Sequence, residues 1–289
     1  MQRLVLAVIL IGVLIVLSVL TWRGHRGQDA LAQARQAGVM RIGYAVEAPY
    51  AFLTPEGQVT GESPEIARVI ANRLGIPRVE WRLAEFGDLM EGLEARRYEV
   101  IAAGMFITPE RQQRAAFSLP TFQVGPGLLV RKGNPLGLHS YADLLQHNEI
   151  RVAVLSGSVE EARLLQLGCP GQRLIRVPDA GTGREAVRSG QADALALSAP
   201  TIRWMSMHPI LGLTEMAEPF TDSGPAGAPA PALGGFVFRK EEAALRQAWD
   251  AELRGFLGSE EHRRLVRAFG FAEAELPAST ARPGNAPPR

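Results

Sequence analysis

The chain has 289 residues, with 31 Lys and Arg against 30 Asp and Glu, so its formal net charge is +1. This balance argues against a nucleic-acid-binding protein, and a hydrophobic content of 46% is too high for a mostly disordered chain. The single cysteine, Cys169, excludes an intrachain disulfide framework and an all-cysteine metal site.

The first segment is an uncharged run from Leu4 to Trp22, composed mainly of Leu, Val and Ile. Its length is close to the roughly 20 residues that span a bilayer as a helix. Such a run is either a secretory signal or an uncleaved signal anchor, and the Thr-Trp-Arg-Gly-His-Arg that ends and follows it is a poor cleavage site. We therefore favour a membrane anchor formed by residues 4–22 over a cleaved signal. Residues 29–37 are expected to form a helix that leads into the first strand.

From residue 39 onward, strand-like and helix-like segments alternate. In the first half, the pattern predicts strands at 39–45, 79–83, 100–103 and 127–131, and helices at 63–74 and 86–95. Thr108-Pro109 predicts a further helix start, because Thr is a good N-cap and Pro suits the first helical position. The pattern restarts near residue 150, with strands at 151–155, 174–177, 194–197 and 235–239, and helices at 159–167, 184–189, 241–257 and 260–268. The restart indicates an α/β protein with parallel-rich sheets in two lobes.

Two segments rich in Gly, Ala and Pro interrupt or end this pattern. Residues 224–233 are expected to form a loop, and residues 278–289 a disordered tail.

The sequence contains none of the common motifs for nucleotide binding, metal binding or nucleophilic catalysis. There is no phosphate-binding loop and no strand-linked G-x-G-x-x-G, and the five histidines lack metal-ligand spacing. The carboxylates form no obvious acid/base pair. We therefore expect no metal, no cofactor and no catalytic residue.

Ligands of open α/β sheets bind outside the carboxyl ends of the strands. The residues that directly follow the predicted strands include three aromatics, a carboxylate, a guanidinium and two hydroxyls. The candidate binding residues are Glu47, Tyr50, Phe86, Phe106, Arg111, Ser158 and Ser198.

These residue types together suit a small zwitterion. Arg111 can bind a carboxylate through two parallel hydrogen bonds, and Ser158 at a helix N-terminus adds a donor and a favourable dipole. The three aromatics can surround a delocalised cation, each contact contributing about 0.5–2 kcal/mol, and Glu47 can accept its N–H. Taken singly, an aromatic is more often a core residue and an arginine more often part of a surface ion pair. Their convergence on one sheet edge favours a binding site.

Several stretches of the chain resemble the polar amino-acid family of extracytoplasmic solute-binding proteins of ABC importers, over about residues 36–277. They are Ala37-Gly38-Val39-Met40-Arg41-Ile42-Gly43, Gly57-Gln58-Val59-Thr60-Gly61, Thr108-Pro109-Glu110-Arg111, Gly190-Gln191-Ala192-Asp193-Ala194 and Phe236-Val237-Phe238-Arg239-Lys240. The resemblance implies a type II clamshell similar to periplasmic binding proteins, hinged by two strand crossings near residues 127–132 and 233–238. It divides the chain into a leader (1–37), lobe 1 (38–127 plus 233–277), lobe 2 (128–232) and a tail (278–289). The ligand would bind between the lobes, and closure would present it to the permease subunits.

Within this family the chain looks most like the ectoine- and hydroxyectoine-binding proteins. The matching stretches include Glu47-Ala48-Pro49-Tyr50, Glu85-Phe86-Gly87 and Ala102-Ala103-Gly104-Met105-Phe106-Ile107-Thr108. The resemblance implies an aromatic cage of Tyr50, Phe86 and Phe106, with Glu47 bonding the ring N–H and Arg111 the carboxylate. Amino-acid binders usually place an Asp five residues after the position of Asp193, where this chain has Ser198. A free α-ammonium group would lose its partner there, which favours an amidinium or quaternary cation.

The sequence therefore predicts a non-enzymatic, extracytoplasmic binding protein that captures ectoine or hydroxyectoine and delivers it to an ABC importer. It would be periplasmic, either secreted or anchored to the inner membrane, and would bind no nucleic acid. Three alternatives stay open: a polar amino-acid or betaine binder, a membrane-tethered sensory module, and an enzyme similar to cyclohexadienyl dehydratases.

Overall fold

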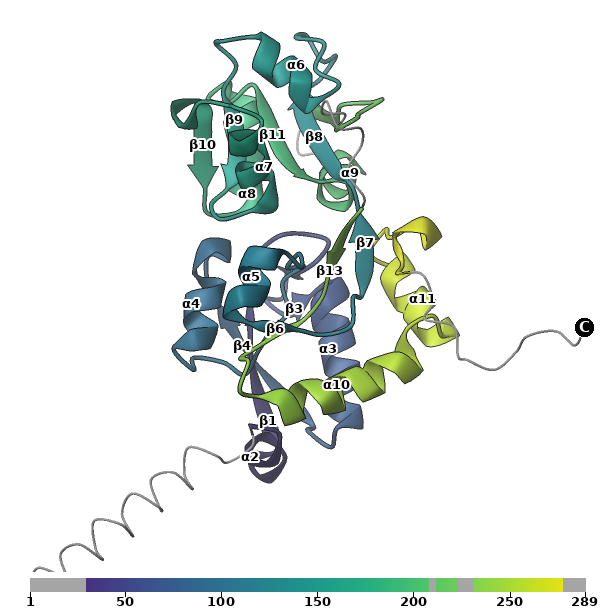
Figure 1. Cartoon of the computed structure of the whole chain (residues 1–289). Helices are drawn as coiled ribbons and strands as arrows, with labels where there is room; N and C mark the ends of the chain where they lie inside the picture. Colours follow the sequence, from purple (N-terminus) through teal and green to yellow (C-terminus); the bar gives the residue numbers. More distant parts are fainter. Residues whose placement is uncertain (1–29, 208–211, 223–230, 278–289) are drawn as a thin grey trace, which may run out of the picture.

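The computed structural model describes residues 30–207, 212–222 and 231–277 (Figure 1). The predicted anchor at 4–22 and the predicted tail at 278–289 lie outside these ranges, as does most of the predicted loop at 224–233. Within the described ranges, no helix has both the length and the apolar character needed to cross a membrane.

The structure contains two five-stranded sheets, one in each half of the molecule (Figure 1). In the first sheet, β1, β4 and β5 are parallel, whereas β14 is antiparallel to both of its neighbours. Its strands in spatial order are β4 (Arg78–Leu83), β1 (Val39–Tyr44), β5 (Val100–Ile101), β14 (Val237–Phe238) and β6 (Ala116–Phe117). The accompanying helices are α2 (Ala30–Ala37), α3 (Glu62–Arg73), α4 (Leu89–Glu94), α5 (Pro109–Arg114), α10 (Ala243–Phe256) and α11 (Glu260–Arg267).

In the second sheet, β9, β10 and β11 are parallel, and β8 is antiparallel to β11 and β12. Its strands in spatial order are β10 (Leu174–Val177), β9 (Val152–Leu155), β11 (Ala194–Ser198), β8 (Pro126–Arg131) and β12 (Thr214–Met216). The accompanying helices are α6 (Tyr141–Gln146), α7 (Val159–Gln166), α8 (Ala180–Ser189) and α9 (Ala199–Met207). The prediction of a two-lobed α/β protein is therefore confirmed, but the sheets are mixed rather than parallel-rich, since each has two parallel and two antiparallel strand pairings.

Two short antiparallel strands connect the halves: β7 (Phe122–Val124) and β13 (Ala232–Gly234) (Figure 1). The first crossing thus comes a few residues earlier in the chain than predicted at 127–132, whereas the second overlaps the start of the predicted range 233–238. Residues 127–131, predicted as part of the first crossing, belong instead to β8, an apolar strand that pairs with β11 on one side and β12 on the other inside the second sheet. Leu233 also lies in a strand and not in the expected loop. The next residue is Gly234, and a side chain would not fit at this position, because a Cβ there would lie 1.9 Å from the Phe122 ring. The residue limits proposed for the two lobes stay a prediction.

Apolar faces determine how the helices pack. Helix α3 buries Ile66, Ala67 and Ile70, which recur at helical spacing.

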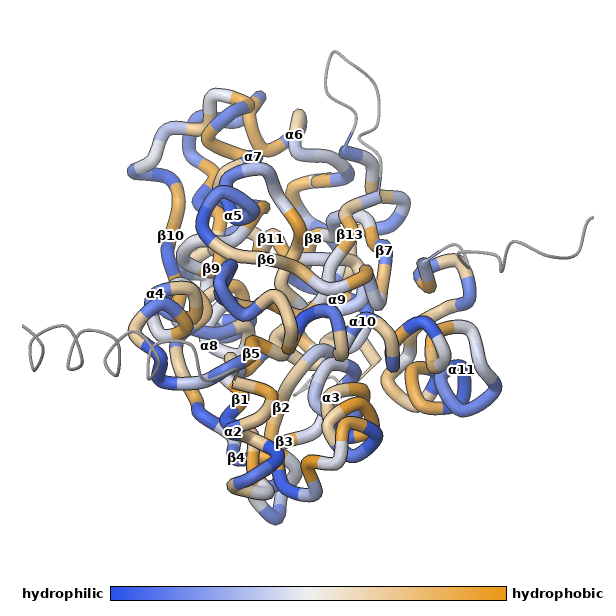
Figure 2. Tube along the Cα trace, turned by 60° about the horizontal axis from the view of Figure 1, so that its bottom comes forward, coloured by the Kyte–Doolittle hydropathy of each residue, from blue (hydrophilic) through white to orange (hydrophobic). Residues whose placement is uncertain are grey.

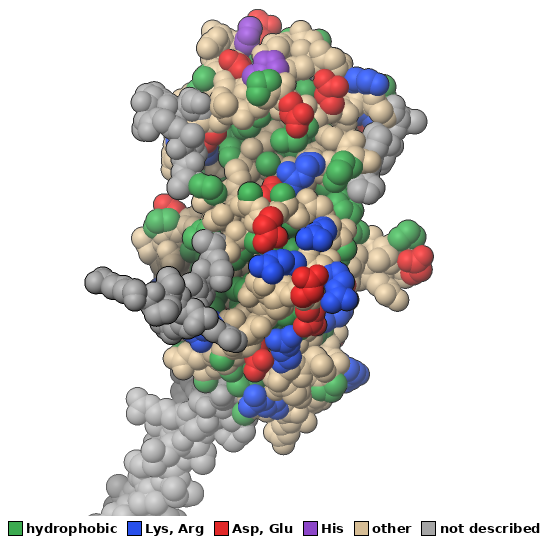
Figure 3. Space-filling model, turned by 90° about the vertical axis from the view of Figure 1, so that its right-hand side faces the viewer, with side chains coloured by type: hydrophobic (Ala, Val, Ile, Leu, Met, Phe, Trp, Pro, Cys, Tyr) green, Lys and Arg blue, Asp and Glu red, His purple; other side chains and the backbone are tan. Residues whose placement is uncertain are grey.

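Figure 2 shows the contrast between apolar β5, in orange, and polar α5, in blue. Figure 3 shows acidic and basic side chains interspersed over the face that carries α11, as expected for a soluble surface without one dominant charge. The remaining short elements are β2 (Phe52–Leu53), β3 (Val59–Thr60), η1 (Phe86–Asp88), η2 (Gly171–Arg173) and η3 (Glu273–Glu275).

Trp249 of α10 anchors the first core. It is fully buried, with its ring centroid 5.0 Å from Phe236 and 5.7 Å from Phe238. We expect Trp249→Ala to lower the free energy of unfolding by about 3–5 kcal/mol, since a large cavity replaces the indole. Urea unfolding followed by circular dichroism measures this change, and Trp249→Phe should cost less. A loss below about 1 kcal/mol for the alanine variant would mean that this core repacks freely.

Candidate functional site

The loop that follows β1 carries Glu47 and Tyr50. A backbone bridge between Glu47 and Ala51 closes this loop on itself and points both side chains toward the second half of the molecule. Thr201 Oγ1 in the first turn of α9 donates a 2.7 Å hydrogen bond to Glu47 Oε1. The Tyr50 hydroxyl donates at 3.1 Å to Oγ of Ser198, the last residue of β11. The structure therefore brings Glu47, Tyr50 and Ser198 together, as predicted for a site at the carboxyl ends of the strands.

The Glu47 carboxyl is buried, and this burial raises its pKa to about 8. The hydrogen bond from Thr201 and the charge of Arg111 lower the pKa, whereas the charge of Glu160 raises it. A buried carboxyl with such a pKa gains greatly from a cation placed beside it, because the cation offsets the loss of solvation.

Arg111 lies on α5, whose start matches the predicted N-cap: Thr108 accepts a hydrogen bond from the Arg111 backbone N–H. Its guanidinium donates to the carbonyl of Phe106 and to the carbonyl of Gly157 in the other half, each at 2.9 Å. Its Cζ lies 5.5 Å from the centroid of the Phe86 ring. Burial lowers the Arg111 pKa, and the charges of nearby glutamates raise it. Since a guanidinium has five N–H groups, donors remain for a carboxylate.

The three predicted cage aromatics are all buried, but they do not form a single stack. Phe86 faces the Arg111 guanidinium. Tyr50 and Phe106 both contact Phe122 of β7. The Phe122 ring centroid lies 4.8 Å from that of Tyr50 and 5.7 Å from that of Phe106. Phe122 was not among the predicted residues, because it lies inside a hinge strand and not after the end of a sheet strand. An aromatic wall thus extends from the Glu47 loop to the hinge.

Ser158 is the N-cap of α7, where its Oγ accepts from the Glu161 backbone N–H at 3.1 Å. Glu161 Oε2 in turn accepts from the Gly157 backbone N–H at 2.8 Å. Part of the predicted anion-binding capacity of this helix start is therefore used within the chain. Ser158 still lies next to Gly157, which accepts from Arg111 across the gap.

Two further polar residues belong to this region and were not predicted. Thr201 is fully buried against Glu47, and Glu160 is a buried acid whose pKa is raised to about 7 by burial and lowered by Arg111. Glu160 sits in the first turn of α7, where acids commonly occupy the solvent-exposed helix start. Its burial is therefore not marked by any local signal in the sequence. Among the described residues, no cluster of three or more potential metal ligands occurs.

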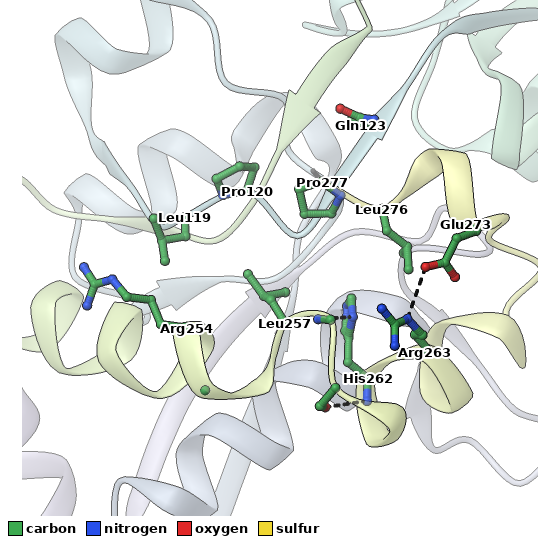
Figure 4. Close-up of a pocket in the computed structure, with 13 residues that line it drawn as sticks. Leu119, Pro120, Gln123, Arg254, Leu257, His262, Arg263, Glu273, Leu276 and Pro277 are labelled. Atoms are coloured by element: carbon green, nitrogen blue, oxygen red, sulfur yellow. Dashed lines mark hydrogen bonds and ion pairs between the residues drawn. The ribbon is translucent and has the colours of Figure 1, made fainter. Parts of the chain in front are cut away.

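Two cavities lie near or on the first half of the molecule. One, of about 360 Å³, opens beside Phe106 and Glu160 and has the size of a small-molecule site. The other, of about 700 Å³, lies at the ends of α10 and α11, away from the predicted residues. Figure 4 shows its apolar side chains Leu119, Leu257 and Leu276, and an Arg263–Glu273 pair at 3.1 Å. Because none of the candidate binding residues lines this larger cavity, we place the candidate site between the two sheets.

Residues 40–271 match the family model of bacterial extracellular solute-binding proteins, family 3. The chain belongs to this family. Membership implies an extracytoplasmic location, as the sequence predicted.

Three known proteins are similar to this chain in sequence or in fold. The probable amino-acid ABC transporter periplasmic-binding protein y4tE of Sinorhizobium fredii is 34% identical over 258 residues, which is 88% of this chain and 83% of the relative. The crystal structure of EhuB in complex with hydroxyectoine superposes with a TM-score of 0.78 at 33% identity, covering 85% of this chain and 94% of EhuB. A membrane-bound lytic murein transglycosylase F of Serratia proteamaculans is 30% identical over 173 residues, which is 58% of this chain but only 34% of that relative.

Gly104 supports the position of Tyr50 in this family 3 protein. Its φ is +64°, and a Cβ there would lie 2.4 Å from Tyr50 Cγ. We expect Gly104→Ala to push the tyrosine ring away and to weaken ligand binding about tenfold, the loss of one well-placed contact. Gly133→Ala is the matched control, because Gly133 has a φ of +80° with nothing within 4 Å of its Cβ position. Equal affinities of the two variants in calorimetry would show that Tyr50 tolerates displacement.

Proposed function

We propose that this protein captures a small zwitterionic compatible solute, ectoine or hydroxyectoine, between its lobes and delivers it to an ABC importer. The observation that carries the proposal is the presence of a buried acid, Glu47, and a guanidinium, Arg111, close enough for each charge to shift the pKa of the other, in a region with three buried aromatic residues. Such a site matches a molecule that has a delocalised cation at one end and a carboxylate at the other.

The proposed roles follow from this geometry. Glu47 accepts the N–H groups of the ligand cation, and Tyr50, Phe86 and Phe106 line its faces. Arg111 holds the carboxylate, with Ser158 beside it at the start of α7. The similarity to a protein crystallised with hydroxyectoine supports this assignment over other zwitterions.

Ser198 supports a ligand without a free α-ammonium group. Its hydroxyl is bonded to Tyr50 and to Thr201, so it offers no charge to pair with an ammonium ion. A primary ammonium buried there would be poorly compensated, whereas a delocalised amidinium spreads its charge over the aromatic faces.

A binding role fits this site better than an enzymatic one. Three aromatic residues, Tyr50, Phe86 and Phe106, are buried in the region of Glu47, and such a set suits the binding of a stable cation. The murein transglycosylase relative has most of its length outside the matched region, so its name carries no activity to this chain. Delivery from a membrane-anchored form through residues 4–22 is part of the proposal.

Isothermal titration calorimetry with ectoine and hydroxyectoine tests the proposal. We expect saturable binding of at least one of them, tighter than that of arginine, glycine betaine or proline betaine under the same conditions. Preferred binding of arginine would instead assign the protein to the amino-acid binders, and the absence of heat and of a thermal shift at millimolar ectoine would contradict the proposal. Aromatic product from prephenate or arogenate would indicate an enzyme.

A further inference from the structure

Four buried side chains form one continuous line of hydrogen bonds through the cleft. The Tyr50 hydroxyl lies 3.1 Å from Ser198 Oγ, Ser198 Oγ lies 3.2 Å from Thr201 Oγ1, and Thr201 Oγ1 lies 2.7 Å from Glu47 Oε1. We call these four residues the hydroxyl relay.

The chemistry of the groups sets the direction of the relay. A hydroxyl has a single proton, and that of Thr201 is donated to Glu47. The proton of Ser198 is therefore donated to Thr201, and Tyr50 donates to Ser198. The Ser198 and Thr201 hydroxyls each accept one bond and donate one, the Tyr50 hydroxyl donates at the start of the line, and the line ends on a carboxyl oxygen.

The relay crosses between the two halves twice. Glu47 and Tyr50 belong to the loop after β1 of the first sheet, whereas Ser198 and Thr201 belong to β11 and α9 of the second half. It can form only when the halves approach each other. Helix α9 is also fixed on another side, where Arg203 pairs with Glu275 of η3 at 2.6 Å.

The relay engages only one of the two Glu47 oxygens. In the part of the chain that the structure describes, no hydrogen bond reaches Oε2 of this residue. A carboxylate fixed through one oxygen keeps its other oxygen in a defined direction, which favours a directed bond to a ligand N–H.

We propose that Ser198 and Thr201 are positioning residues that clasp the two lobes together and orient Glu47 toward the ligand. The orientation part rests on the proposed function, whereas the clasp can be tested without any ligand. Closure and recognition of the ligand cation would then depend on the same four side chains.

Three groups besides Thr201 face the Glu47 carboxyl: Arg111 from α5, Glu160 from α7 and Tyr50 from its own loop. The bond from Thr201 stabilises the Glu47 carboxylate and so lowers its pKa. Removing only this hydroxyl should raise the Glu47 pKa further, while the other three groups stay in place.

The first experiment follows the Glu47 side-chain carbon by ¹³C NMR during a pH titration of the full chain without ligand. We expect a higher midpoint in Thr201→Val than in the wild type. Thr201→Ser should retain the wild-type midpoint because it keeps the hydroxyl. Ser206→Ala is the matched control on α9, since the Ser206 hydroxyl bonds only the Ile202 carbonyl of its own helix. Equal midpoints in the wild type and in Thr201→Val would overturn the proposal.

The second experiment measures ectoine and hydroxyectoine affinity in the same variants. Thr201→Val should weaken binding about 10- to 100-fold, the effect of losing a hydrogen bond to a charged group. Ser198→Ala leaves the Thr201–Glu47 bond intact, so it should weaken binding less and leave the Glu47 midpoint nearer to the wild-type value. Wild-type affinity in Thr201→Val would overturn the positioning role. If the wild type binds neither compound, the proposed function fails, and the ligand-free titration still decides whether the clasp exists.

Discussion

Replacing Arg111 by alanine should weaken binding of any carboxylate-bearing ligand at least 100-fold. In the structure this guanidinium is half-buried and is fixed by two carbonyl groups, one from each half of the molecule. The substitution removes the charge partner of the ligand carboxylate, which would be left buried without compensation. Truncating one member of a buried charge pair commonly costs about 2–5 kcal/mol or more.

Calorimetry of three variants separates this effect from simple loss of structure. Arg114→Ala is the matched control on the same helix, because Arg114 is exposed and pairs with Glu94 at 2.8 Å. It should retain wild-type affinity, since exposed ion pairs contribute little. Arg111→Lys keeps the charge but loses the two-pronged geometry, so its affinity should fall between the other two. Tight ligand binding by Arg111→Ala would exclude this arginine as the carboxylate anchor.

Most helices and eight of the strands were predictable because their signals are local, whereas the short strands β2, β3, β6, β7, β12 and β13 were not predicted. Helix α7 follows a Ser N-cap, and β9 is an apolar run, so both were predicted to within one or two residues. Helices α6 and α9 were missed. For α9 the reason is visible in the sequence. It begins directly after β11 with Ala199-Pro200, and no polar break separates the two elements. Because Thr201 lies in the first turn of α9, it was not predicted as a site residue either.

The candidate site was predictable where residues follow strands, and not where burial depends on the opposite half. Glu47, Tyr50 and Arg111 were found because ligand sites form at strand ends. Glu160 and Thr201 carry no such mark: an acid at a helix start and a threonine in a first turn are ordinary surface residues. In the folded chain both are buried polar groups. The positions of these two residues are therefore a tertiary property of the fold.

Ligand affinity should fall as the pH is lowered below 8. Burial raises the Glu47 pKa to about 8 and the Glu160 pKa to about 7, so below these values the carboxyls of the closed cleft hold protons. A ligand cation beside Glu47 favours the carboxylate and lowers this pKa, so binding must release a proton. For a single proton, the affinity should fall by up to tenfold per pH unit below 8, and become independent of pH above it.

Stability without ligand should depend on pH in the opposite direction. Both pKa values are raised above the ordinary value of 4.5, so between about pH 4.5 and 8 the folded chain holds protons that the unfolded chain has released. Stability from these two groups is therefore present at low pH and is lost as the pH rises through 7 and 8.

Calorimetry in buffers of different ionisation enthalpy counts the released protons directly. Glu47→Gln cannot ionise, so its affinity should be lower but should no longer change with pH through Glu47. An unchanged pH profile in this variant would assign the proton to another group. Since an amide can still accept the Thr201 hydrogen bond, the variant keeps the clasp and removes only the charge. Comparison with Thr201→Val, which keeps the charge and removes the hydrogen bond to Glu47, therefore separates the two contributions of the Glu47 side chain.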